Sequence, residues 1–412
     1  MTEEENYEYV KETLKEEYIV SFKSEDLHII KSIESCINCG ICLYHCPVIR
    51  AVGVHRFTGP RGIAVELSRS PPEYWSSADR IYLCTGCGTC REVCPNNVNI
   101  PEIVHLIRAR IFIQKPALVP TSLKSQVEIL REHDLAFEPW DDPQEKIDSR
   151  LMRLQRFGLP IIEDRTVSGA DVLFYPGCQA EERAQEVREA AKTIFEYFNI
   201  QYTLLDEMSC CGLPSALAGD HEKTEDLTKK LRKKVDSLRV KKIVTTCAGC
   251  TSNLGGIAER ENWGIPVLHM LEYLVEEIGI EALSSSFKKK TKSDPVTVTV
   301  HDPCHLIRHT SRQVMDYADL ILKAIPSVQV NRSSLHDSCC GGGGLVGRHS
   351  PDVARGIVKE NVRAISSTGA HRVVTPCPLC TAQLEENLHR QGSSIEVDDL
   401  TVFIAQSLSQ EE

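Results

Sequence analysis

The sequence predicts a helical, cysteine-rich N-terminal part followed by two α/β domains related by pseudo-symmetry. Two observations support this fold class. The 18 cysteines form four groups with two styles of spacing, and each style occurs twice. The residues around the later groups also repeat, since MSCCGLPSALAGD resembles DSCCGGGGLVGRHSPD and KKIVTTCAGC resembles HRVVTPCPLC. A chain of 412 residues is long enough for two to four domains, so we expect an internal duplication.

The composition excludes several classes of protein. Apolar residues make up 42% and charged residues 25% of the chain, as in soluble globular proteins. The net charge of −11 argues against a protein that coats nucleic acid. No apolar signal segment follows Met1 and no apolar run is long enough to span a bilayer, so we expect a cytoplasmic protein, with peripheral attachment to the cytoplasmic face of the membrane left open. In that reducing compartment, clustered cysteines bind metal or perform redox chemistry.

Local composition suggests the boundaries between domains. The first 35 residues carry more than half of the net negative charge of the chain and are expected to form an acidic, partly helical arm. Prolines punctuate a connecting helical segment, and a lysine-rich stretch separates the two later repeats. The expected divisions are an arm at 1–35, a cysteine-rich domain at 36–115, a connecting helical segment at 116–168, a first α/β domain at 169–287, a linker at 288–295 and a second α/β domain at 296–412.

The first style of spacing is C-x2-C-x2-C-x3-C-P, which occurs twice. Its members are Cys36, Cys39, Cys42 and Cys46, followed by Pro47, and Cys84, Cys87, Cys90 and Cys94, followed by Pro95. Three cysteines at intervals of three residues place their sulfurs around one loop, which suits a cubane iron–sulfur cluster. A pair of structural zinc sites is the alternative, although zinc ligands usually come as two C-x2-C pairs.

The second style joins a lone cysteine, an adjacent pair followed by glycine, and a C-x2-C. Its members are Cys178, Cys210, Cys211, Cys247 and Cys250 in one copy and Cys304, Cys339, Cys340, Cys377 and Cys380 in the other. An adjacent pair is awkward for a single tetrahedral metal but suits a larger cluster lying against the backbone, which glycine lets approach.

Apolar strands at 171–175, 241–246, 296–300 and 372–375 run directly into these cysteines, and helical stretches at 187–198 and 381–390 follow. Each C-x2-C is therefore expected at a helix N-terminus, where the thiolate is favoured.

Residues 36 to 110 resemble two-cluster ferredoxins, in the α-helical form found in respiratory iron–sulfur subunits, because 37 residues separate the two runs. In that family the cysteine before proline ligates the other cluster. The resemblance implies two cubane [4Fe-4S] clusters, one held by Cys36, Cys39, Cys42 and Cys94 and the other by Cys84, Cys87, Cys90 and Cys46. Such a domain carries electrons and binds no substrate.

Residues 169 to 400 resemble the duplicated cysteine-rich CCG domain of heterodisulfide reductase. The resemblance implies that each copy holds a noncubane [4Fe-4S] cluster through its five cysteines, and that a disulfide of the CoM-S-S-CoB type is split between the two. The order of the parts is similar to the fused D-type subunit of methanogenesis, which partners a membrane cytochrome b. The fold expected from both resemblances is an α-helical two-cluster ferredoxin domain followed by two pseudo-symmetric α/β CCG domains, and the expected function is catalytic.

A different function remains possible from the same order of parts. Iron–sulfur subunits of glycolate oxidase and anaerobic glycerol-3-phosphate dehydrogenase share it, and so does a subunit of thiol:fumarate reductase that carries an additional [2Fe-2S] motif absent here. The chain would then only transfer electrons for a flavin-dependent dehydrogenase or reductase of glycolate, lactate, glycerol 3-phosphate or fumarate. Two complete five-cysteine sites favour disulfide chemistry instead. Without a flavin or haem motif, the electron-donating subunit, a flavoprotein or a cytochrome b, is expected to be a separate chain.

Three other features allow two interpretations each. His301, His305, His336 and His371 lie near the cysteines in sequence, either as proton donors or as hydrogen-bond donors to thiolates. The run Gly341 to Gly344 lacks the Lys-Ser/Thr of a phosphate-binding loop and is expected to pack against a cluster. Arg56 and Arg61 either contact a partner or a quinone, or belong to a helix–turn between the clusters.

Overall fold

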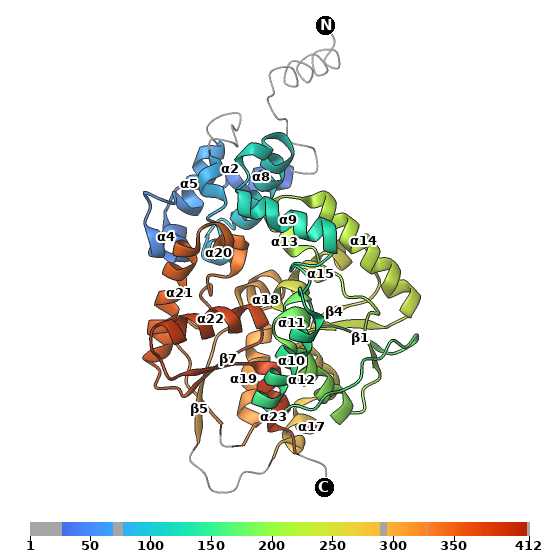
Figure 1. Cartoon of the computed structure of the whole chain (residues 1–412). Helices are drawn as coiled ribbons and strands as arrows, with labels where there is room; N and C mark the ends of the chain where they lie inside the picture. The colour runs from blue at the N-terminus through green and yellow to red at the C-terminus, as the bar shows by residue number, and fades with distance from the viewer. Residues whose placement is uncertain (1–26, 69–76, 289–294, 327, 410–412) are drawn as a thin grey trace.

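The structure is a computed structural model that describes residues 27–68, 77–288, 295–326 and 328–409. The expected acidic arm up to residue 26 and linker residues 289–294 lie outside these ranges. Figure 1 shows the helical N-terminal part at one end of the molecule, with the first α/β half in green and yellow and the second in orange and red side by side beneath it.

The N-terminal part is helical, as predicted. Its helices are short because cysteine-containing loops interrupt them, and Gly40 and Gly88 adopt left-handed backbone angles (φ 80° and 77°) where the loops enter helices. Ile33 is buried, so the described end of the expected arm belongs to this packed unit. The helices are α2 (Leu27–Glu34), α3 (Ile41–His45), α4 (Pro47–Val52), α5 (Gly59–Ser68), α6 (Ala78–Ile81), α7 (Thr89–Glu92) and α8 (Ile100–Gln114).

The first α/β half is built on a four-stranded parallel sheet of order β2-β1-β3-β4. Its strands are β1 (Val172–Tyr175), β2 (Tyr202–Thr203), β3 (Lys242–Thr245) and β4 (Val267–His269). Its helices are α11 (Cys178–Glu182), α12 (Gln185–Tyr197), α13 (Leu213–Ala218), α14 (His221–Leu238), α15 (Ala248–Arg260), α16 (Met270–Tyr273), the π-helix η4 (Leu274–Ile278) and α17 (Ile280–Ser286).

The second half repeats this topology with the sheet order β6-β5-β7-β8, again parallel. Its strands are β5 (Val296–Val300), β6 (Val328–Val330), β7 (Arg372–Thr375) and β8 (Glu396–Asp399). Its helices are α18 (Cys304–His309), α19 (Gln313–Ala324), the 3-10 helix η5 (Gly343–Leu345), α20 (Val346–His349), α21 (Pro351–Ser366), α22 (Pro378–Arg390) and α23 (Leu400–Ser407). The duplication expected from the cysteine spacing is confirmed.

Reciprocal contacts relate the two halves by a pseudo-twofold axis. Helix α12 of the first half packs on α23 of the second, and α19 of the second packs on α16 and α17 of the first. Phe287 and Leu408, which follow the last helix of each half, form an antiparallel bridge. Each contact therefore has a counterpart, as expected when two copies of one unit pack face to face.

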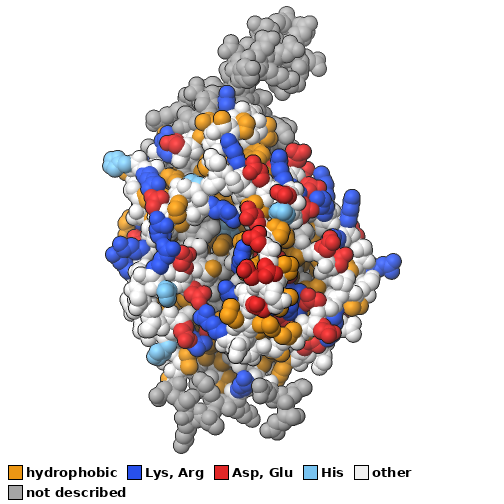
Figure 2. Space-filling view, viewed as in Figure 1, with side chains coloured by type: hydrophobic (Ala, Val, Ile, Leu, Met, Phe, Trp, Pro, Cys, Tyr) orange, Lys and Arg blue, Asp and Glu red, His pale blue; other side chains and the backbone are white. Residues whose placement is uncertain are grey.

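The connecting segment forms η3 (Pro116–Leu118), α9 (Thr121–His133) and α10 (Pro143–Phe157). Helix α9 packs on α13 and α20, one from each half, and α10 packs on α12 with an ion pair of 2.6 Å between Arg150 and the buried Glu189. Because of these contacts, the connecting segment is an integral layer of the fold. On the face of the molecule drawn in Figure 2, basic and acidic side chains are intermingled.

One buried side chain connects all three parts. The guanidinium of Arg108, on α8, is fully buried and donates hydrogen bonds to the carbonyl oxygens of Ile81 (3.0 Å) and Cys84 (2.8 Å) in the N-terminal part. It also donates to the carbonyls of Leu217 (2.9 Å) in the first half and Gly344 (3.3 Å) in the second. A planar group with five donors suits such a cluster of carbonyls.

Arg108→Met should lower the stability of the whole chain, because it leaves these carbonyl oxygens buried without their donor. A loss of about 3 kcal/mol is expected. Thermal unfolding should show a midpoint about 3–4 °C lower than that of the wild type. Lys229→Met, which removes only an exposed ion pair with Glu225, is the control, and an equal shift in both variants would contradict the role given to Arg108.

Candidate metal centres

The first N-terminal site gathers Cys36, Cys39, Cys42 and Cys94 around one small pocket, which Cys90 of the neighbouring set and Arg61 also border. Burial raises the pKa of Cys42, and the three other thiols of the set raise it further. Cys39 is exposed, whereas every other cysteine of the chain is half-buried or buried. This site therefore lies nearest to solvent.

The second N-terminal site gathers Cys46, Cys84, Cys87 and Cys90. Burial raises the pKa of Cys46, and its neighbours Cys87 and Cys84 add to the rise. Burial raises the pKa of Cys90 well above its ordinary value, and the neighbouring thiols raise it further. A bound metal would stabilise the thiolate forms of these crowded cysteines, so this donor set fits a metal cluster. The structure thus brings together both sets of four cysteines expected from the ferredoxin resemblance.

The cysteines of the two α/β halves converge because each follows the carboxyl end of a parallel strand. Cys178 and Cys304 begin α11 and α18, directly after β1 and β5. Cys247 and Cys377 are the N-caps of α15 and α22, after β3 and β7. Gly177 lies so close to the site that a Cβ there would come within 2.8 Å of the Cys250 sulfur.

The ten thiols form one continuous row in which each is a neighbour of the next. The order is Cys178, Cys210, Cys211, Cys250, Cys247, Cys377, Cys380, Cys340, Cys339, Cys304. The second five repeat the first five in reverse, so the pseudo-twofold axis passes between Cys247 and Cys377. Hydrogen bonds from flanking thiols lower the pKa of Cys211 and of Cys339 well below the ordinary value. Buried thiolates surrounded by further thiols are a suitable donor set for iron.

Both five-cysteine sets face a single cavity of about 420 Å³, which nine of the ten cysteines line. Its other walls come from the glycine loop of the second half, from α13 of the first half and from the connecting segment. Most of these residues are apolar or small, including Phe137, Leu213, Leu217, Leu345 and Leu379. The polar or charged ones are Gln126, Gln179, His305, Arg348 and Gln383. A small molecule in this cavity would touch both sets of thiols at once.

The four candidate histidines occupy different surroundings. His305 lines the cavity. His301 lies beside the second set, with a ring nitrogen and the sulfurs of Cys340 and Cys380 all within 4.8 Å of one another, and its Nε2 has no hydrogen-bond partner in the described chain. His336 is instead bound to Asp302 (2.8 Å), and His371 is exposed.

The register of the strands reveals a difference between the sites that sequence reasoning missed. Val172 pairs with Lys242 as Val298 pairs with Arg372, so the counterpart of His301 in the first half is Tyr175. The Tyr175 hydroxyl donates to the carbonyl oxygen of Ser209 at 2.5 Å. The two otherwise similar sites therefore differ in the polar side chain next to their thiols.

The glycine run presses against the loop of the second N-terminal site. A Cβ on Gly344 would lie 2.2 Å from the carbonyl oxygen of Cys84, and one on Gly343 would lie 2.5 Å from that of Thr85. The Thr85 hydroxyl is also a hydrogen-bonding neighbour of the Cys339 thiol. The expectation that these glycines pack beside a cysteine site agrees with this geometry, and the set of the second half is the one that adjoins the N-terminal part.

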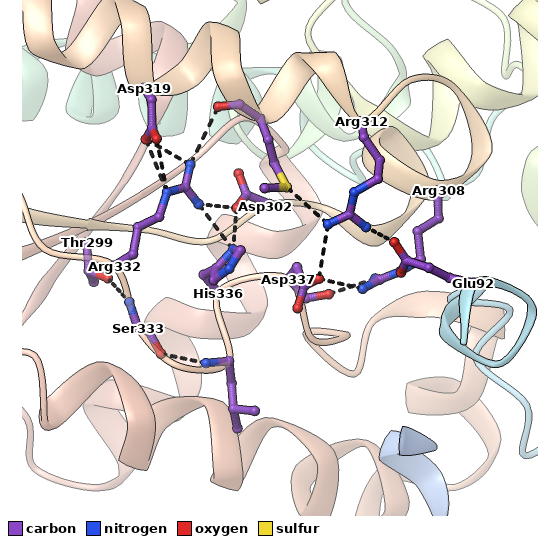
Figure 3. Close-up of polar contacts among 12 residues, drawn as sticks. Glu92, Thr299, Asp302, Arg308, Arg312, Asp319, Arg332, Ser333, His336 and Asp337 are labelled. Atoms are coloured by element: carbon purple, nitrogen blue, oxygen red, sulfur yellow. Dashed lines mark hydrogen bonds and ion pairs between the residues drawn. The ribbon is translucent and has the colours of Figure 1, made fainter. Parts of the chain in front are cut away.

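A buried arginine fixes the same joint, as Figure 3 shows. Arg308, on α18, forms ion pairs with Glu92 of α7 (2.6 Å) and with Asp337 (2.8 Å), and Arg312 also contacts Glu92. In a separate group, Arg332 contacts Asp302, Asp319 and His336. Because α18 begins with Cys304 and α7 contains Cys90, the first group holds two cysteine sites in a fixed relation.

The two arginines noted in the N-terminal part have distinct positions. Arg56 forms an ion pair with Asp352 of α21 and so links the N-terminal part to the second half. Arg61 borders the pocket of the first N-terminal site.

Comparison with known families agrees with this division. A model for the CCG cysteine-rich domain matches residues 172–255 and 298–385, and a model for a 4Fe-4S dicluster domain matches residues 32–98. The D-type subunit of the dihydromethanophenazine:CoB–CoM heterodisulfide reductase of Methanosarcina barkeri is 26% identical over 92% of this chain and 95% of its own length.

Proteins whose names give other functions also resemble this chain. The B-type subunit of the fumarate reductase (CoM/CoB) of Methanothermobacter marburgensis is 26% identical over 91% of this chain and 72% of its own. Lactate utilization protein A of Exiguobacterium sp. is 21% identical over 58% of this chain and 99% of its own.

Among solved structures, a hypothetical protein from Helicobacter pylori aligns over all of this chain and 78% of its own, with 10% identity and a TM-score of 0.53. This likeness concerns the fold alone.

No helix in the described part of the chain is long and apolar enough to cross a membrane.

Gly344→Ala should disturb the contact between the glycine loop and the Cys84 loop, because its Cβ has no room. Gly392→Ala is a matched control, since both glycines have left-handed backbone angles (φ 65° and 69°) but nothing lies within 4 Å of a Cβ at Gly392. We expect the Gly344 variant to lose about 2 kcal/mol more stability than the control. Thermal unfolding measures the difference, and equal losses in the two variants would mean that the close contact is unimportant.

Proposed function

Since this chain joins a 4Fe-4S dicluster domain to a duplicated cysteine-rich domain, and resembles the D-type subunit of heterodisulfide reductase over most of its length, we propose that it is the catalytic iron–sulfur subunit of a heterodisulfide-reductase-like complex. The observation that carries the proposal is the cavity lined by two five-cysteine sets that the pseudo-twofold axis relates. A subunit that only relayed electrons would not need two such sets around one empty space. The proposed reaction is reductive cleavage of a small disulfide in that cavity.

The proposed cofactors are four [4Fe-4S] clusters, two of the cubane type in the N-terminal part and two noncubane clusters on the five-cysteine sets. The crowded thiols of the N-terminal sites, whose pKa values are raised by burial and by one another, support metal at these two sites. The close grouping of five cysteines on each side of the cavity supports metal at the other two. Bound clusters of this kind would supply electrons one at a time. The pairing of the cysteines is the one implied by the ferredoxin and CCG resemblances, and the grouping of the thiols supports it.

Electrons are proposed to enter at the first N-terminal site, whose Cys39 is exposed to a partner. They then pass to the second N-terminal site, whose Cys84 loop touches the glycine loop next to Cys339. The set of the second half is therefore reached before the set of the first. The ion pairs of Arg308 keep this junction fixed, which favours transfer over a constant distance.

Cleavage of a disulfide consumes two electrons and two protons and yields two thiols. The chain places one five-cysteine set on each side of the cavity, so the two sulfurs of a bound disulfide can face different sets. Leu213 and Leu217 cover one side of the cavity and keep water away from the sulfurs. His305 is positioned in the wall where it can hydrogen-bond to a product sulfur.

The proposal requires an electron-donating subunit, since the sequence carries no flavin or haem motif. The two reductase relatives named above are themselves subunits of complexes, which supports assembly with a flavoprotein or a cytochrome. The alternative, a relay subunit for a flavin-dependent dehydrogenase or fumarate reductase, predicts that the cavity binds no thiol.

Cys340→Ala tests the proposal by removing one donor from the set of the second half. In anaerobically purified protein we expect about sixteen irons per chain for the wild type and about twelve for the variant. Disulfide reduction with an artificial electron donor should fall to background, while dithionite still reduces the N-terminal clusters, as followed by EPR.

Ser209→Ala, next to Cys210 but with a hydroxyl that has no hydrogen-bond partner in the described chain, is the control and should retain iron and activity. Wild-type protein with about eight irons and no EPR change on adding thiols would refute the proposal. Such a result would leave the relay function as the better account.

A further inference from the structure

The cavity between the cysteine sets has one charged residue in its wall. Among the described residues that line it, Arg348 is the only Arg, Lys, Asp or Glu, and the other walls are cysteine, small, apolar or neutral. Arg348 is exposed to solvent at the edge of the cavity, so its charge is accessible to a ligand that enters there. The guanidinium is therefore a candidate ligand-binding group.

Arg348 has no partner within the part of the chain that the structure describes. Its side chain makes no hydrogen bond or ion pair there, and Glu138, the acidic residue that acts on it, is exposed and not bonded to it. Burial of part of the side chain lowers the pKa of Arg348. By contrast, a hydrogen bond to Asp352 raises the pKa of Arg56. Within the described residues, Arg348 is therefore unpaired, whereas Arg56 is paired with Asp352.

The backbone that carries Arg348 is held in place. The neighbouring His349 ring contacts the carbonyl oxygen of Tyr82 at 2.6 Å, which ties α20 to the N-terminal part. Helix α20 also packs on α9 and α21. The backbone of Arg348 is accordingly held at a solvent-accessible edge of the cavity, on the side of the second half, and its side chain extends from there.

The corresponding turn of the first half carries no charge into the cavity. Between Cys211 and α14 it contributes Leu213, Pro214 and Leu217. One end of the cavity is therefore cationic and the other apolar, although the thiols themselves are arranged symmetrically. An occupant that fits both ends has two chemically different halves.

We propose that Arg348 binds an acidic group, such as a carboxylate, sulfonate or phosphate, on the half of the substrate that lies against the cysteine set of the second half. This inference rests on the proposed function and extends it to the class of substrate. A guanidinium recognises such groups through paired, charge-assisted hydrogen bonds.

Anaerobic titration calorimetry on the full, cluster-loaded chain tests the inference with two small thiols of similar length, 3-mercaptopropionate and the uncharged 2-mercaptoethanol. We expect the wild type to bind the acid about tenfold more tightly. Arg348→Gln should abolish this preference, and Arg348→Lys should retain part of it because the charge remains. Arg355→Gln, which changes an exposed arginine of α21 outside the cavity wall, is the matched control and should retain the full preference.

Equal binding of both thiols by the wild type, failure of the acid to bind, or a preference that survives in Arg348→Gln would overturn the inference. EPR of the same samples judges the proposed function separately. Binding of the acid that depends on Arg348, without any thiol-dependent paramagnetic signal, would establish the anion site and reject disulfide chemistry at the cysteines. Thermal unfolding of each variant verifies that the chain is folded.

Discussion

The buried guanidinium of Arg108 is the interaction on which the arrangement of the three parts depends. Its four acceptor carbonyls come from the N-terminal part and from both α/β halves, and two of them belong to Cys84 and Gly344. One side chain thereby fixes the loop of an N-terminal cysteine site against the glycine loop beside the cysteines of the second half. A buried arginine whose two terminal nitrogens are bonded to four carbonyl oxygens tolerates little displacement of its partners, so it holds the neighbouring cysteine sites at fixed distances.

The pseudo-twofold symmetry of the two α/β halves, and the residues at which the halves differ, explain the rest of the site. Duplication gives two parallel sheets whose carboxyl ends face each other, and this alone produces the row of ten thiols and the shared cavity. The differences between the copies then assign separate roles to them. Tyr175 stands where the second half has His301, and a leucine-bearing turn stands where the second half has Arg348. The N-terminal part contacts both copies, but its Cys84 loop lies against the glycine loop of the second half.

The cysteine spacing sufficed to predict the helical N-terminal part, the two α/β halves and the groups in which the thiols gather. These features follow from local pattern, because strands, helix starts and loop cysteines are set by neighbouring residues. The sequence could not indicate which copy adjoins the N-terminal part, since the contact of Gly344 with Cys84 joins residues far apart in the chain. The position of α9 against both halves, the four acceptors of Arg108 and the unpaired state of Arg348 likewise arise only from tertiary packing.

The exposure of Cys39 affects where the protein is sensitive to oxygen. The exposure that would let a partner deliver electrons to this site also gives dissolved oxygen access to it, whereas nine of the ten cysteines in the five-cysteine sets are buried. Oxidative damage would then begin at the first N-terminal site. Electron transfer would stop before the damage reached the thiols that face the cavity. With electrons entering as proposed, loss of this outermost site would stop electron transfer while the buried cysteines around the cavity stayed intact.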